Sequence, residues 1–130
     1  MNTQEITIQS AVDLMEFIDI FGMSPEQVPS GKNIDDLIDF LIAVEFKEYR
    51  ITSHWKTYIK KHKDFIFVLT IDMRVVNPKW CRPKYKYIYE MSSRIMGRPK
   101  IFLNKNENFR DVLRNSFVDV MNYDSGNTIL

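Results

Sequence analysis

The sequence predicts a small α+β domain, and three observations lead to this prediction. Apolar residues recur at helical spacing in two segments before residue 45 and in another after residue 108. Between them, apolar and polar residues alternate with the period of two that is typical of a β-strand. The length of 130 residues, with 45% hydrophobic and 27% charged residues, is that of one globular domain. We expect two N-terminal helices, a central antiparallel β-hairpin or small sheet, and one or two C-terminal helices.

Residues 10–21 and 33–44 are predicted to form the two N-terminal helices. Gly22 is placed to end the first helix in a left-handed conformation, and Asn33 is placed to cap the start of the second. Ser24 precedes a proline and stands three residues before a glutamine, which predicts one short capped turn between the helices. The apolar positions expected to face the core are Val12, Met15, Ile18 and Phe21, then Ile34, Leu37, Ile38 and Leu41.

An antiparallel β-hairpin is predicted for the centre of the chain. Residues 49–59 alternate strictly, residues 60–64 form a polar turn, and residues 65–76 are apolar at nearly every position. Such a continuous apolar run is typical of a strand that is covered on both faces. In the first strand, we expect Ile51, Trp55 and Ile59 to face the core, and Arg50, His54, Lys56, Tyr58 and Lys60 to face solvent.

The segment of residues 84–96 fits either a helix or a strand. Its apolar residues recur at helical spacing, with Pro83 at the start and Gly97 just past the end. Its first tyrosines, however, alternate as they would in a strand. We expect the helix, because both of its ends carry suitable residues. Residues 100–103 are predicted to add a short strand and residues 109–121 a final helix.

The chain shows no linker or repeat that would divide it. Residues 1–123 are expected to form a single domain, and residues 124–130 a loose tail. Cys81 is the only cysteine, so an internal disulfide is impossible, and residues 1–10 lack the basic start of a signal peptide. Apolar runs such as residues 65–71 fall short of the roughly 20 residues of a membrane helix. We therefore expect a cytoplasmic protein in a reducing compartment.

The net charge of +1 conceals a strong asymmetry along the chain. Residues 1–45 carry −8, residues 46–100 carry +10 and residues 101–130 carry −1. Such polarity is a hint of a nucleic-acid partner, whose phosphates the cations would hold while an aromatic ring stacks on a base. The residues expected to contact nucleic acid are Arg50, His54, Lys56, Tyr58, Lys60, Lys61, Lys63, Trp80 and Arg82.

Other functions stay open at this stage. The acidic N-terminal helices could bind a basic protein, as a small inhibitor or adaptor of viral or mobile-element origin would. The residues of that alternative surface are Asp13, Glu16, Asp35, Asp36 and Asp39. Glu45 and Lys47 have the Glu-x-Lys spacing of many metal-dependent nucleases, for which Asp36 or Asp39 would supply the further carboxylate. A basic strand face can also be merely solvated, because lysine protects sheet edges from aggregation.

The sequence contains no recognisable catalytic, metal-binding or cofactor-binding motif. His54, His62 and Cys81 are too few and too scattered for a zinc site, and the four glycines are isolated from one another. The segment 97–100 (Gly-Arg-Pro-Lys) resembles part of an AT-hook core, but its apolar neighbours favour a turn. We therefore expect a non-enzymatic protein without metal or cofactor that binds nucleic acid or a ribonucleoprotein.

Overall fold

A computed structural model describes residues 11–52, 55–75 and 85–124, and confirms the predicted α+β class. The described elements are two N-terminal helices with a short 3-10 turn between them, five strands and one C-terminal helix. In chain order they are α1 (Ala11–Phe21), η1 (Pro25–Gln27), α2 (Ile34–Ala43), β1 (Lys47–Ile51), β2 (Trp55–His62), β3 (Phe65–Val75), β4 (Tyr85–Ile95), β5 (Ile101–Asn106) and α3 (Phe109–Asp124).

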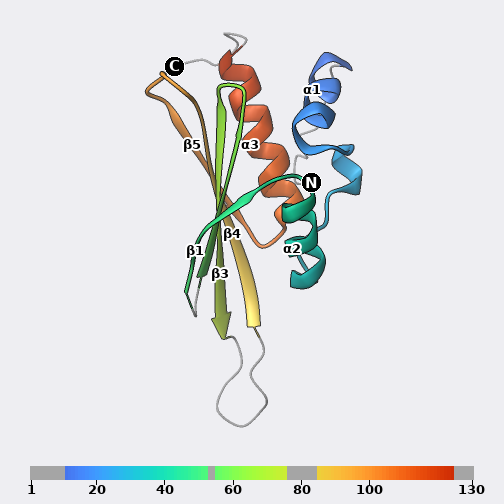
Figure 1. Ribbon diagram of the computed structural model, residues 1–130, viewed down its shortest axis with the longest axis vertical. Coiled ribbons are helices and arrows are strands. Elements are labelled where there is room, and N and C mark those ends of the chain that lie inside the picture. The colour runs from blue at the N-terminus through green and yellow to red at the C-terminus, as the bar shows by residue number, and fades with distance from the viewer. Residues whose placement is uncertain (1–10, 53–54, 76–84, 125–130) are drawn as a thin grey trace, which may run out of the picture.

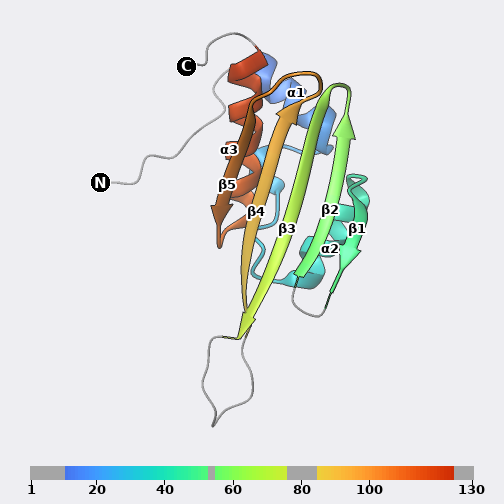
Figure 2. The same ribbon diagram turned by 90° about the vertical axis from the view of Figure 1, so that its left-hand side faces the viewer.

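The five strands form one antiparallel sheet in the order β1-β2-β3-β4-β5. The described helices all lie on one face of this sheet, and none of them covers the opposite face, which we call the open face (Figures 1 and 2). The expectation that residues 65–76 form a strand covered on both faces is therefore wrong. Only alternate residues of β3, from Phe65 to Ile71, are buried, while Ile66, Val68 and Thr70 are half-buried on the open face.

The predicted hairpin is confirmed, but its first strand is divided in two. Instead of one strand over residues 49–59, the chain turns after β1, and β1 and β2 pair antiparallel. Thr52 Oγ1 accepts a hydrogen bond from the Trp55 backbone N–H (3.1 Å) at this turn. Strand β2 then continues to His62, so the turn into β3 begins only at Lys63, which has a positive φ of 53°.

Residues 84–96 do not form the expected helix, because β4 occupies residues 85–95. Strand β4 pairs with β3 at eleven positions, from Val75 opposite Tyr85 to Phe65 opposite Ile95. It also pairs with β5 on its other side. Gly97, with a φ of +84°, lies in the turn between β4 and β5 rather than at a helix end. The hydrogen bonds of these two ladders outweigh the helical spacing of the segment. Because they join strands that are distant in the sequence, the residues of one segment cannot reveal them.

The predicted end of α1 and the predicted cap of α2 are confirmed. Gly22 has a φ of +76°, and its backbone N–H donates to the Ile18 carbonyl at 2.7 Å. Asn33 caps α2, since its Oδ1 accepts hydrogen bonds from the backbone N–H groups of Asp35 (3.0 Å) and Asp36 (3.2 Å). Helix α3 includes Asp124, which was expected to belong to the loose tail, and the rest of that segment, residues 125–130, lies outside the described ranges.

The core lies between the helices and one face of the sheet. Phenylalanine rings of α1, α3 and β3 meet in it: the centroid of Phe117 lies 5.2 Å from that of Phe17, and the centroid of Phe21 lies 5.4 Å from that of Phe67. The predicted core stripe of α1 is partly wrong, because Met15 is exposed and Ile18 is partly exposed. The buried residues of this helix are Phe17, Ile20 and Phe21.

Candidate functional site

The side chains of β2 point in the opposite directions to those predicted. Tyr58 and Lys60, expected in solvent, are only 4% and 5% exposed and face the helices, whereas Trp55 is 47% exposed. Tyr58 lies opposite Leu69 in the sheet and Lys60 lies opposite Phe67, so both share the buried face. A shift of one residue in strand phase reverses every side chain. The turn after β1 and the bulge at residue 49 interrupt the alternation from which the phase was inferred.

Lys60 is therefore a buried residue that stabilises the fold. Its Nζ donates a hydrogen bond to the Val44 carbonyl at 2.5 Å, which ties β2 to the end of α2. Burial lowers the pKa of Lys60, and the nearby Glu45 carboxylate partly opposes this by raising it. Burial likewise raises the pKa of Tyr58, and the charge of Glu48 adds to the increase. Neither residue is available to a partner on the surface.

The turn between β2 and β3 contacts the acidic helix α1. His62 Nε2 lies 2.9 Å from Asp19 Oδ2, and Lys63 Nζ lies 3.5 Å from carboxylate oxygens of both Glu16 and Asp19. The hydrogen bond with His62 lowers the pKa of Asp19, and the charge of Glu16 raises the pKa of Lys63. Lys63, expected to bind nucleic acid, and Glu16, expected to bind a basic partner, thus neutralise each other.

The open face of the sheet carries a positive charge. Cross-strand register places two carboxylates on it, Asp72 and Glu90, against seven cations. Arg74 pairs with Asp72 at 2.9 Å, and Lys86 pairs with Glu107. Within the described ranges, no carboxylate lies at ion-pair distance from the other five, Lys47, Arg50, Lys61, Arg94 and Lys105. We call these five residues the open-face cations.

Aliphatic side chains lie between the open-face cations. One row crosses all five strands, in the order Lys47, Ile59, Val68, Ser92 and Leu103. A second row, which begins at β2, consists of Lys61, Ile66, Arg94 and Ile101. Leu103 is 66% exposed and Ile101 is 52% exposed. A solvated face of an antiparallel sheet is normally polar, so this mixture of aliphatic and cationic side chains is typical of a contact surface.

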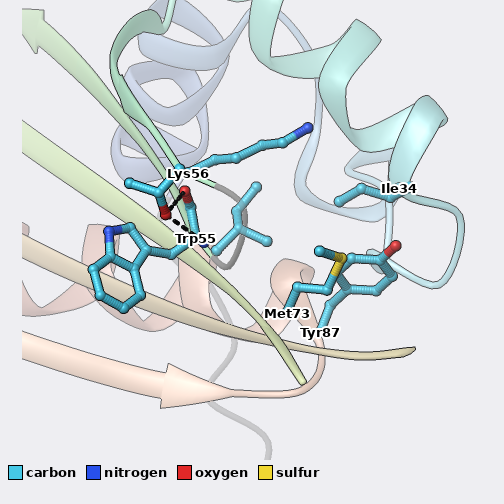
Figure 3. A pocket seen from close by; sticks show the side chains of 7 residues that line it. Ile34, Trp55, Lys56, Met73 and Tyr87 are labelled. Atoms are coloured by element: carbon cyan, nitrogen blue, oxygen red, sulfur yellow. Dashed lines mark hydrogen bonds between the residues drawn. The ribbon is translucent and has the colours of Figure 1, made fainter. Parts of the chain in front are cut away.

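Trp55 and Lys56 show the strand phase directly (Figure 3). The indole of Trp55 points away from Met73 and Tyr87, whereas Lys56 extends toward the side of Ile34 in α2. Lys56, Met73, Tyr87 and Ile34 help to line a small, largely apolar pocket of about 120 Å³ between α2 and the sheet. Lys56 is thus not on the open face, contrary to the prediction, and Trp55 supplies an exposed aromatic ring there.

No family model matches the chain. Comparisons with curated proteins and with solved structures also find no match, so the geometry of the described residues carries the functional argument. Over residues 11–52, 55–75 and 85–124, no three His, Cys, Asp or Glu side chains lie together where they could hold a metal ion. No helix in these ranges is long and apolar enough to span a membrane.

The structure places the described members of the predicted nucleic-acid contacts in three different settings. Arg50 and Lys61 lie on the open face, while Lys63 is paired with α1. Lys56, Tyr58 and Lys60 lie on the helix side, and His54, Trp80 and Arg82 fall outside the described residues. The open face also carries Lys47, Trp55, Arg94 and Lys105, which were not among the predicted contacts. Alternation within residues 85–95 could have indicated Arg94, had that segment been taken as a strand.

The Glu-x-Lys pair does not have the strand geometry that a nuclease site was expected to use. Glu45 lies in the turn before β1, with a φ of +67°, and only Lys47 is part of the strand. Asp36 and Asp39 project from the exposed side of α2. The acidic and basic groups of the pair are therefore not presented by alternate residues of one strand.

Proposed function

We propose that the protein binds single-stranded nucleic acid on the open face of its sheet. One observation carries this proposal: the open-face cations border aliphatic rows, and no carboxylate of the described residues lies at ion-pair distance from them. Lysine and arginine side chains would hold the phosphates, and the ring of Trp55 would stack on a base. No metal or cofactor is needed for such binding.

The shape of the surface favours single strands over duplex. A duplex exposes its base edges only within grooves, which an inserted helix or β-ribbon can enter. The open face is instead a broad sheet of five strands (Figure 2). Unpaired bases can lie flat on such a surface and cover Ile59, Val68 and Trp55, while their phosphates contact the cations around them.

Reversing two open-face cations tests the proposal. We expect the double variant Arg50→Glu/Lys61→Glu to bind a labelled single-stranded oligonucleotide roughly tenfold more weakly than the unaltered chain, because two phosphate contacts become repulsive. Fluorescence anisotropy at about 50 and 200 mM salt would measure this, and binding by the unaltered chain should weaken at the higher salt.

A matched control separates a local contact from a general charge effect. Lys32→Glu/Arg98→Glu changes the net charge by the same amount, from +1 to −3. These residues lie away from the open face, since Lys32 precedes α2 and the Arg98 guanidinium lies 5.4 Å from the ring centroid of Tyr123 in α3. This control should retain most of its affinity. Equal loss in both variants, or no binding at low salt, would contradict the proposal.

The acidic side of α2 supports a second candidate function. Asp35, Asp36 and Asp39 are exposed, and no described lysine or arginine lies at ion-pair distance from them. These carboxylates would suit a basic protein segment. The variant Asp35→Asn/Asp36→Asn/Asp39→Asn should then lose retention on an immobilised lysine-rich peptide, and unchanged retention would exclude this surface.

A further inference from the structure

We propose that two copies of the chain pair through β5 and join their sheets into one continuous antiparallel sheet. The observation behind this inference is the difference between the two outer strands of the sheet, β1 and β5, each of which has one neighbour among the described strands. An unpaired strand edge offers backbone N–H and C=O groups to another strand, and proteins normally protect such edges. The inference does not rest on the proposed function.

Strand β1 has the protection that an outer strand needs. It is only five residues long, and its register with β2 is interrupted by a bulge between Glu48 and Arg50. Lys47, Glu48 and Arg50 also place charges along it, so another strand would have to bury them. Bulges, short length and charges are the usual means by which proteins prevent pairing at an edge.

Strand β5 lacks most of this protection. It pairs with β4 without interruption over its six residues, so its edge stays regular. Its open-face side chains include Ile101 and Leu103, which are 52% and 66% exposed. In the described part of the chain, no segment other than β4 pairs with it. The strand is therefore a regular edge whose first half is apolar and carries two exposed aliphatic side chains, and pairing with another strand would cover it.

A second copy is the partner that β5 fits best. With Leu103 on a twofold axis perpendicular to the sheet, residues 101–105 of each copy lie opposite each other. Leu103 then meets its own copy, Lys105 faces Ile101, and Lys100 faces Asn106, so no two like charges are opposed. All helices stay on one side of the joined sheet. The outer edges of the dimer are then two β1 strands, both of them protected, so assembly stops at two copies.

Disulfide cross-linking at the proposed axis tests this register. In a Cys81→Ser background, Leu103→Cys should give a covalent dimer under mild oxidation, because opposed residues of an antiparallel pair lie about 4.5–5.5 Å apart at Cα. Lys105→Cys serves as the register control: its two copies would be offset by four residues, or about 13 Å, and should not cross-link. A mixture of Ile101→Cys and Lys105→Cys chains should cross-link to each other.

Sedimentation of the unaltered chain tests the assembly itself. We expect a species of twice the 15.5 kDa chain mass that Leu103→Lys converts to single chains. Ile59→Lys, on the same open face but on β2, should leave the dimer intact, which distinguishes pairing of edges from stacking of faces. A single-chain mass at every concentration would overturn the proposal. So would a dimer that withstands Leu103→Lys and fails to cross-link at residue 103.

Discussion

Replacing Gly31 with alanine is expected to destabilise the fold by about 3 kcal/mol, through backbone strain and overpacking together. Gly31 has a φ of +93°, a backbone conformation that residues other than glycine rarely adopt. A Cβ built on it would lie 2.6–2.7 Å from atoms of the Tyr89 ring, including the hydroxyl oxygen. Tyr89 is fully buried in β4, so its ring has little room to move away.

The same contact anchors the segment before α2 to the sheet. The Tyr89 hydroxyl donates a hydrogen bond to the Gly31 carbonyl at 2.6 Å, and the Phe109 backbone N–H donates to the Ser30 carbonyl at 2.7 Å. Burial raises the pKa of Tyr89 to about 12, so its hydroxyl stays protonated and able to donate even in moderately alkaline solution. A displaced ring would weaken this anchor as well as the packing.

Gly97 provides a matched control for the Gly31 substitution. Its φ of +84° is similarly strained for alanine, but a Cβ there would meet no atom within 4 Å. Gly97→Ala should therefore cost only about 1 kcal/mol, from backbone strain alone. Urea unfolding followed by circular dichroism would measure both variants. Equal losses would show that the contact with Tyr89 adds nothing to the strain.

Replacing Lys60 with alanine is expected to cost about 2 kcal/mol of stability, because it leaves the Val44 carbonyl without its hydrogen bond and removes a packed side chain. The Lys60 ammonium reaches that carbonyl at 2.5 Å, and the residue is only 5% exposed. Removal of a desolvated charge offsets part of this loss. The measurement is again the free energy of unfolding in urea.

Lys61, the next residue, gives the opposite expectation. It is exposed on the open face, so Lys61→Ala should change stability by no more than about 0.5 kcal/mol. For affinity the expectation is reversed. Lys61→Ala should weaken binding to single-stranded nucleic acid, whereas the folded fraction of Lys60→Ala should bind with unchanged affinity. If Lys60→Ala were neutral for stability, the assigned role of its ammonium would be wrong.

Features that depend on a few neighbouring residues could be predicted from the sequence. Asn33 can cap α2 because its side chain reaches backbone N–H groups two and three residues later. Gly22 ends α1 because it lacks a Cβ and so adopts a positive φ without strain. Helical spacing in three segments and alternation around residue 58 predicted the order of helices and the central hairpin for the same reason.

The places where distant segments meet could be seen only in the folded chain. Residues 85–95 became β4 rather than a helix because β3 and β5 pair with them on both sides. The phase of β2 was decided by its partners, since the position opposite Leu69 is on the buried face and Tyr58 occupies it. A period of two predicts which residues share a face, but it cannot tell which face the helices will cover.

For the candidate site, too, the sequence predicts local properties and the fold decides which residues meet. The sequence determined that the centre of the chain is strongly basic and its N-terminal part strongly acidic. It did not reveal which cations would be neutralised, because that depends on contacts across the fold. The turn at Lys63 packs against Glu16 of α1, whereas Arg50 and Lys61 point to the side of the sheet that carries no helix. The amino-acid composition thus sets the charge of each segment. The packing of the described helices on one face of the sheet decides which of the charged side chains remain exposed.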